Sequence, residues 1–393
     1  MKMSIPKSQN GFSLLELLIA TFIGLIVMAA MTSMFRMGLN AMLTVTQRAE
    51  TQQNMRAAID LMTKDISMAG AGLPTGGLQL ASGSATKVAC NQTGTCYVPS
   101  DSYPASGGGT PNYMYGILPG FSNGVQSSAV ITNAPAAVND SITSIYCDYN
   151  FPLTNFNFAF SSSTAATATV VNAAVTPNNI LSPGGLNVGD LLLFIVSTPG
   201  TGVGSGSQGT SVAQTAAAVG EITGLPAGPT TGVQGALVLT FASGDALNFN
   251  QTGANSLASV AGASAVGTTM TVCRLNVVTY FLQVPAAGGT VQVPRLMRQV
   301  NGLTAVPVAD SIINLQFSYD VINSATGAIS ANQSNPIAAG LSPALIQKVN
   351  IWVMGEGLLT NKTQSQSMYL ASSVSARNMS FCNSYSDQTT ACQ

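Results

Sequence analysis

The strongest pattern in the chain is an apolar run near its N-terminus. Residues 17–35 are uncharged and mostly apolar, and Glu16 is the one charge in the longer run from Phe12 to Phe35. Because about 20 apolar residues in a helix cross a hydrocarbon layer of about 30 Å, this run predicts a membrane span. The first eleven residues contain Lys2 and Lys7 and no acidic residue. The positive-inside rule therefore keeps the N-terminus cytoplasmic and exports everything after Phe35.

Helix-forming residues continue beyond the apolar run, and no proline follows it until Pro74. Apolar residues spaced by four, three and four positions predict one stripe that packs on a sheet, and charged residues, among them Asp65, are expected mostly off it. The stripe is Met55, Ile59, Met62 and Ile66. Gly70 and Gly72 before Pro74 predict the end of the helix. One helix is therefore expected over residues 12–69.

Beyond residue 75 the pattern changes to short β-like runs between Gly, Pro, Asn and Ser clusters, with no helix of comparable periodicity. Segments 82–109, 161–174 and 198–218 are nearly uncharged and rich in small residues, which predicts surface loops or poorly packed insertions. The sequence thus predicts an α+β fold, a long N-terminal helix packed on a large β-rich C-terminal head. The clearest expected strands are Leu191 to Val196, Ala236 to Phe241, Thr271 to Gln283, Ile312 to Val321, Val349 to Met354 and Ser367 to Val374.

Charge and composition exclude several functions. Charged residues make up 7% of the chain, the net charge is −1, and there is no Lys/Arg run, so a nucleic-acid partner is not expected. Histidine is absent, which removes the commonest general base and the commonest metal ligand. We therefore expect no enzyme activity, no catalytic residue, no bound metal and no cofactor.

Three motifs are interpreted as coincidental or structural. Residues 120–124 match the G-x-S-x-G nucleophile elbow, but a triad needs a histidine. Residues 204–209 match G-x-G-x-x-G inside a Gly/Ser tract without the following helix of a dinucleotide site. Aspartates flank two expected strands without the dense oxygen spacing of a calcium loop, and a solvated surface role is expected for them. They are Asp140 and Asp148, and Asp310 and Asp320.

Six cysteines lie beyond residue 70, and none forms a C-x-x-C pair: Cys90, Cys96, Cys147, Cys273, Cys382 and Cys392. Six cysteines allow many connectivities, so a pairing can be proposed from proximity alone. The short spacings suit two small loops, 90 with 96 and 382 with 392, and leave Cys147 and Cys273 for a long-range bridge. An exported head meets an oxidising compartment, which favours disulfides over free buried thiols.

The segment Gly11-Phe12-Ser13-Leu14-Leu15-Glu16 follows a short basic stretch. An ordinary signal peptide places its cleavage site after the apolar region, whereas Gly11 precedes it. The segment resembles the prepilin peptidase site of type IV pilins and type II secretion pseudopilins. The resemblance implies that prepilin peptidase cuts after Gly11 and that Phe12 becomes N-methylated. It divides the chain into a leader (1–11), a transmembrane and assembly helix (12–69) and an exported head (70–393).

Glu16 is a carboxylate inside the span. Inserting such a charge into the membrane costs about 2.5–3.5 kcal/mol on insertion scales, so a partner that compensates the charge is expected. The nearest candidate partner is the α-amino group of Phe12, from the same chain or from a neighbour. The resemblance gives Glu16 a role in subunit assembly through the neighbour's N-terminus. The alternative is that Glu16 lies at headgroup depth without a partner.

The order of segments in the second half resembles that of PilW-type minor pilins. Leu61 to Gly72 also resembles the D-[IL]-x-x-A-G turn of that family. The matching segments are LNVGDLLLF, VGEITGL, VVTYFLQV, PRLMRQVNG, PVADSIINLQFSYDV and IQKVNIWVM.

The resemblance implies a minor pilin that primes assembly of a type IV pilus and lies at or near its tip. The long head favours a subunit present in few copies over one that is repeated along the fibre lattice. Its partners would be prepilin peptidase, the inner membrane, and other minor pilins and the major pilin through the N-terminal helix. The head would be periplasmic before assembly and part of the cell-surface pilus afterwards. Two alternatives stay open, a J-type pseudopilin of type II secretion and an adhesive tip module whose neutral loops contact a surface.

Overall fold

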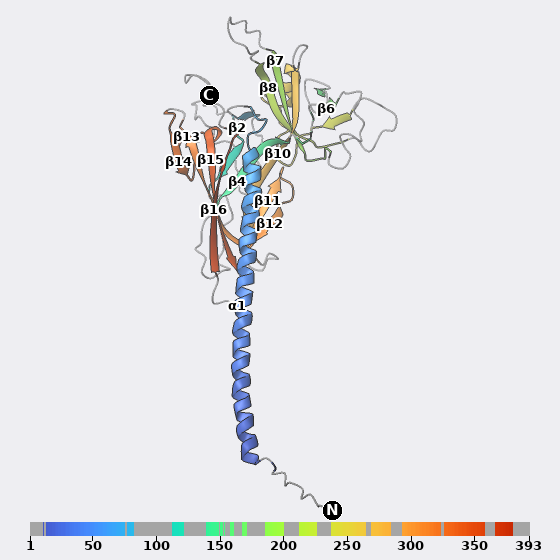
Figure 1. Cartoon of the computed structure of the whole chain (residues 1–393). Helices are drawn as coiled ribbons and strands as arrows, with labels where there is room; N and C mark the ends of the chain where they lie inside the picture. Colours follow the sequence, from blue (N-terminus) through green and yellow to red (C-terminus); the bar gives the residue numbers. More distant parts are fainter. Residues whose placement is uncertain are drawn as a thin grey trace, which may run out of the picture.

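The protein consists of one long helix and a β-rich head, an α+β fold (Figure 1). The description rests on a computed structural model of the chain. It covers residues 11, 13–74, 77–81, 112–121, 139–148, 150, 151, 153, 158–160, 167–170, 185–199, 212–225, 237–264, 269–283, 293–323, 326–357 and 366–379.

Helix α1 (Leu14–Met68) has 55 residues and is long and apolar enough to cross a membrane. It begins after Ser13 and ends before Gly70, whose φ of +82° is the left-handed conformation that glycine adopts most easily. The bounds lie close to the expected 12–69, and Phe12 lies outside the described residues. All residues from Leu14 to Leu43 are exposed, whereas the second half packs on the head. One continuous helix therefore has a first half that makes no contact with the described part of the head and a second half that is packed on it.

The apolar stripe of the second half of α1 is confirmed as the face that packs on the head. Its four members are buried in one hydrophobic cluster with residues of two sheets, including Tyr280, Phe317 and Ile351. Ala58 completes this face and is fully buried. The 3.6-residue period of the helix thus places the stripe over the sheets.

A seven-stranded antiparallel sheet forms the centre of the head, in the order β12-β11-β10-β4-β3, with β7 and β8 attached to the other part of β10. Residues 269–275 of β10 pair with β7, and residues 274–280 pair with β4. The long strand β10 thus joins the part of the head next to α1 to the part farther away (Figure 1). The strands are β3 (Ile117–Gly120), β4 (Ser141–Asp148), β7 (Leu191–Pro199), β8 (Val212–Glu221), β10 (Thr269–Gln283), β11 (Arg295–Val300) and β12 (Val306–Asp310).

The C-terminal sheet is antiparallel in the order β14-β13-β15-β16. Alternate residues of β13 and β15, such as Leu315, Phe317 and Ile351, are buried against α1, and the residues between them form the opposite face. Strand β16 runs beside α1 (Figure 1). The strands are β13 (Ile312–Ile322), β14 (Ile329–Gln333), β15 (Ile346–Gly357) and β16 (Gln366–Ser375), and the 3-10 helix η2 (Pro343–Leu345) precedes β15.

The part of the head farthest from the N-terminus has its own apolar cluster around Phe194 of β7. The Phe194 ring contacts Phe158 and Phe241 edge to face. Its elements are a three-stranded sheet of β5 (Phe158–Phe160), β6 (Thr167–Val170) and β9 (Leu237–Thr240), and the short helix α3 (Leu257–Ala263). A small two-stranded sheet is made of β1 (Leu78–Leu80) and β2 (Asn112–Met114).

All six clearest expected strands are confirmed in β7, β9, β10, β13, β15 and β16, although β9 (Leu237–Thr240) is shorter than the expected strand from Ala236 to Phe241. The interpretation of 198–218 and 161–174 as loops is wrong in part, because β8 begins at Val212 and β6 lies at Thr167–Val170. Strand β8 is rich in alanine, a poor strand former, but it pairs along the apolar strand β7. Segment 82–109 lies outside the described residues.

Candidate functional site

The first candidate site is the N-terminal end of α1. Gly11 is exposed, and a Cβ built on it would meet no atom within 4 Å. The helix starts three residues later, and the backbone N–H of Glu16 donates to the carbonyl of Ser13 at 3.0 Å. Glu16 therefore lies in the first helical turn, where the helix dipole favours a negative charge. The expected cleavage position at Gly11 and the Glu16 carboxylate lie within one six-residue segment.

The exposed half of α1 carries large apolar side chains on all its sides. Exposed positions include Leu14, Phe22, Met34, Phe35 and Val45. An apolar surface of this extent belongs in lipid or against other apolar helices rather than in water. A Cβ built on Gly24 or Gly38 would meet no atom of the described chain within 4 Å, so both glycines are open to a neighbouring helix.

The second candidate site is the contact that holds the other half of α1 to the head. The Asp65 carboxylate is buried, and it accepts hydrogen bonds from the Tyr146 hydroxyl at 2.9 Å and from the Tyr280 hydroxyl at 2.6 Å. The Nε of Arg298 donates to the same carboxylate at 2.9 Å. These partners come from β4, β10 and β11, so one helical side chain binds three strands of the central sheet. We call these four residues the Asp65 cluster.

The expectation that Asp65 lies off the buried stripe is wrong. It follows Met62 by three positions and precedes Ile66, so it shares their side of the helix. The signal that was missed is this i, i+3 spacing. A charge on an apolar stripe predicts a partner of opposite charge, and the half-buried Arg298 is that partner.

Burial and the neighbouring carboxylate keep the two tyrosines of the Asp65 cluster protonated. Burial is the larger cause and Asp65 the next, and together they raise the pKa of Tyr280 and of Tyr146 well above the ordinary tyrosine value. For Arg298, burial disfavours the charged form, but the bonds to Asp65 and Tyr280 outweigh it and raise its pKa. Both tyrosines therefore stay hydroxyl donors, and Arg298 stays a charged guanidinium.

Three residues of the Asp65 cluster come from segments that resemble those of PilW-type pilins in sequence, a resemblance that stays an expectation. Asp65 belongs to the D-I-x-x-A-G turn, Tyr280 to VVTYFLQV and Arg298 to PRLMRQVNG. The turn after Asp65 also has a structural role, because the Gly70 N–H donates to the Ile145 carbonyl and the Cys147 N–H to the Ala71 carbonyl, both at 2.8 Å. The chain that leaves the helix thus joins the edge of β4.

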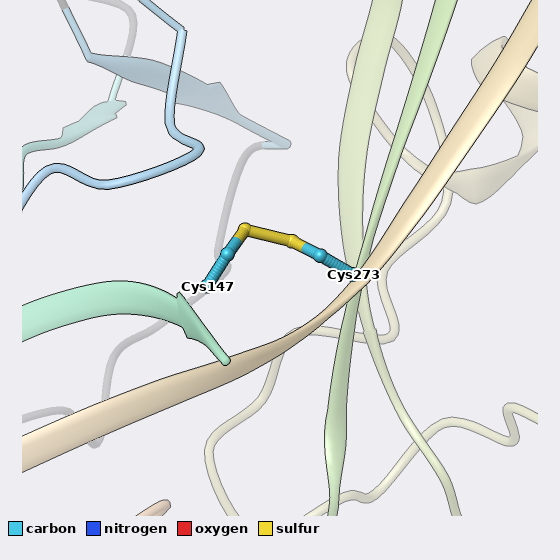
Figure 2. The surroundings of a disulfide bond; sticks show 2 residues. All are labelled: Cys147 and Cys273. Atoms are coloured by element: carbon cyan, nitrogen blue, oxygen red, sulfur yellow. A yellow bond between two sulfur atoms is a disulfide. The ribbon is translucent and has the colours of Figure 1, made fainter. Parts of the chain in front are cut away.

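A disulfide joins Cys147 of β4 to Cys273 of β10 (Figure 2). The Cα atoms are 5.7 Å apart, although 126 residues separate the cysteines in sequence. This is the long-range pair proposed from the spacing. Cys90, Cys96, Cys382 and Cys392 lie outside the described residues, so the two proposed small loops stay predictions.

The expected solvated surface role of the four aspartates is wrong for Asp140, which is buried, and for the half-buried Asp148 and Asp320, whereas Asp310 is exposed as expected. Asp140 is buried and accepts from the backbone N–H of Phe317 at 3.0 Å, which links the start of β4 to β13. The other three form ion pairs across strands, Asp148 with Arg274, Asp310 with Arg295 and Asp320 with Lys348. Within the described part of the chain no group of three or more His, Cys, Asp or Glu residues could hold a metal ion.

The two motifs set aside at the sequence level are scarcely covered by the structure. Of residues 120–124 only Gly120 and Phe121 are described, and Gly120 lies in β3, where a Cβ would approach the Ser141 hydroxyl oxygen to 2.1 Å. Residues 204–209 lie outside the described residues. That both motifs are coincidental therefore stays a prediction from the sequence.

Residues 6–32 match the family described as Prokaryotic N-terminal methylation motif. No curated protein and no solved structure gave a match to the chain. The matched residues include Gly11, Phe12 and Glu16 and reach into the exposed apolar half of α1. The motif implies processing by prepilin peptidase and association with the membrane. Together with the long N-terminal helix, it supports a type IV pilin-like or pseudopilin-type protein.

Proposed function

We propose that this type IV pilin-like chain is a PilW-type minor pilin that primes assembly of a type IV pilus and stays at or near its tip. The observation that carries the proposal is the divided helix α1. Its first half bears the methylation motif and an exposed apolar surface, and its second half is bound to the head through the Asp65 cluster. A force or movement on the helix is thereby transmitted to the head.

In this proposal the exposed half of α1 lies in the inner membrane before assembly, with the head in the periplasm. On assembly it packs against the helices of other minor pilins and of the major pilin, and the head reaches the cell surface. Glu16 pairs with the N-terminal amine of a neighbouring subunit, because an apolar helix bundle offers a carboxylate few other partners. This role needs no catalytic group, cofactor or nucleic acid.

The size of the head supports a place at the end of the fibre. The chain has 393 residues and α1 ends at Met68, so more than 300 residues follow the helix. The described part of the head contains three hydrophobic clusters, and the one around Phe194 includes no residue of α1. A subunit repeated along a fibre has to fit between its neighbours, whereas a terminal subunit has room on one side.

The experiment is a deletion of the gene with complementation by the full chain. We expect few or no pili on the deletion strain, wild-type numbers after complementation, and immunogold label at pilus ends. Sheared fibres should contain the mature protein at a small fraction of the major pilin.

Two outcomes would overturn the proposed function in favour of a named alternative. Normal pili together with a defect in protein secretion would identify a pseudopilin of type II secretion. Normal pili together with lost attachment to surfaces would identify a binding module that assembly does not require.

A further inference from the structure

The face of the C-terminal sheet that points away from α1 contains a groove of about 490 Å³. The sheet register aligns its lining in two rows across β13, β15 and β16, first Gln316, Trp352 and Ala371, then Ser318, Asn350 and Ser373. These residues alternate along the strands with the buried residues that contact α1. The groove is therefore backed by the core of the head.

Of the two rings in one aromatic pair, Trp352 lines the groove and Tyr369 lies next to it. The ring of Trp352 is stacked with that of Tyr369, with a centroid distance of 6.4 Å and an angle of 23° between the planes. Tyr369 is 73% exposed, so the pair is open to solvent rather than part of the core. The residue paired with Trp352 on β16 is the small Ala371, which leaves space beside the indole.

Polar side chains along the other row are held in place by neighbours. The Asn350 amide nitrogen lies 3.3 Å from the Ser318 hydroxyl and 3.2 Å from both an Asp320 carboxylate oxygen and the Asn332 amide oxygen. Asp320 is in turn paired with Lys348 at 2.9 Å. Fixed donors and acceptors beside an apolar surface are typical of small-ligand sites, because little side-chain entropy is lost on binding.

We propose that this groove binds a neutral carbohydrate, a chain of β-linked hexopyranose units. A pyranose ring presents a flat face of C–H groups, which an aromatic ring covers, and a rim of hydroxyls, which amides and serines bind. No residue that lines the groove carries a charge, and the nearby Asp320 is neutralised by Lys348, so the site fits a neutral sugar better than an acidic one.

The carbohydrate site goes beyond the proposed assembly role and does not depend on it. It is built on β13, β15 and β16 on the side opposite α1, so packing of α1 in a helix bundle leaves the groove open. A protein partner is a poorer fit. Phe317 and Ile351 also line the groove but are buried in the core with α1, and the other lining residues besides Trp352 have small or amide side chains instead of a contiguous apolar patch.

The test uses the full chain in a zwitterionic detergent, since detergents with sugar headgroups would compete for the groove. Trp352 is the only tryptophan in the chain, so tryptophan emission, excited at a wavelength that tyrosine does not absorb, reports on this groove alone. We expect a saturable change in its emission with at least one of cellohexaose, chitohexaose and laminarihexaose, and no change with an alginate hexamer of similar length.

Substitutions test whether sugar binding depends on the groove or on another part of the head. Tyr369→Ala keeps the fluorescent reporter and should weaken binding. Trp352→Ala, measured by co-sedimentation with insoluble cellulose, chitin or β-1,3-glucan, should weaken binding roughly tenfold or more, as truncation of a central aromatic anchor does. Trp352→Phe should retain part of the affinity. The control is Ile329→Ala, which removes an exposed apolar side chain from the same sheet outside the groove and should bind normally.

Several results would overturn the carbohydrate site. They are no emission change with any neutral sugar, equal binding by wild type and Trp352→Ala, or equal binding of alginate. A shift in emission that depends on protein concentration and not on sugar would show that a second copy of the chain covers the groove. An unchanged melting temperature of Trp352→Ala ensures that lost binding reflects the site and not unfolding.

Discussion

The Asp65 carboxylate of α1 and the Arg298 guanidinium of β11 lie 2.9 Å apart, although 233 residues separate them in sequence. Both Tyr146 and Tyr280 donate to the same carboxylate, so both of its oxygens and both hydroxyls have a partner. This buried ion pair fixes the long helix on the central sheet and thereby sets the direction in which the head points.

Asp65→Asn should destabilise the protein by about 3–5 kcal/mol, because it leaves Arg298 as an uncompensated charge beside two buried hydroxyls. The measurement is chemical unfolding of the full chain in detergent. Asp60→Asn changes an exposed carboxylate of the same helix and should shift stability by no more than about 0.5 kcal/mol. Equal stability of the two variants would contradict the assigned role of the cluster.

A double-mutant cycle measures the Asp65 to Arg298 contact itself. Arg298→Gln in the Asp65→Asn background should cost much less than it costs in the wild type, because the charge it removes is already unpaired. Strict additivity of the two substitutions would mean that the two side chains do not interact in solution.

Loss of the disulfide should destabilise the head by about 2–5 kcal/mol, because the unfolded chain gains conformational entropy when its long loop is no longer closed. The variant is Cys147→Ala with Cys273→Ala, compared with wild type by thermal unfolding without reductant. The single variant Cys147→Ala should expose one alkylatable thiol at Cys273. Peptide mapping of wild type should find no free thiol among the six cysteines, and alkylation of Cys147 or Cys273 in native protein would disprove the bridge.

Processing should remove residues 1–11 and add one methyl group to Phe12. The matched methylation motif and the exposure of Gly11 motivate this expectation. Intact-mass measurement of protein purified from its own cells checks it. Gly11→Ala should accumulate precursor, and an uncut wild-type N-terminus in a cell with active prepilin peptidase would refute the processing site.

Glu16→Ala should separate processing from assembly. The substitution leaves Gly11 and the span intact and relieves the cost of a carboxylate in lipid, so the variant should still insert and be cut. It lacks the partner for a neighbour's N-terminal amine, so we expect a normal mature band in membranes and a depleted band in sheared pili.

The matched control for Glu16→Ala is Glu50→Ala, which removes an exposed carboxylate from the same helix beyond the apolar run. It should enter sheared pili like the wild type. Equal recovery of the Glu16→Ala variant in that fraction would show that Glu16 has no pairing role and that the helix faces alone recruit the subunit.

Sequence patterns were enough for the features that depend on neighbouring residues. The apolar run, the stripe from Met55 to Ile66 and the glycine turn at Gly70 each follow from spacing within one helix, and all three are present in α1. The methylation motif is likewise a contiguous segment, recognisable without a fold. The strongest strands carry enough β-branched and aromatic residues to be located, although their partners cannot be.

Tertiary structure decided the features whose partners are far apart in the chain. Alanine-rich β8 is a strand because β7 offers it a ladder of backbone hydrogen bonds, which its own side chains do not predict. Asp65 is buried because two tyrosines and an arginine reach it from three strands, and only the folded sheet brings them together. The groove at Trp352 exists because register aligns β13, β15 and β16. Local spacing determines what one helix or strand buries, whereas the desolvation of a charge or a ring depends on every element packed around it.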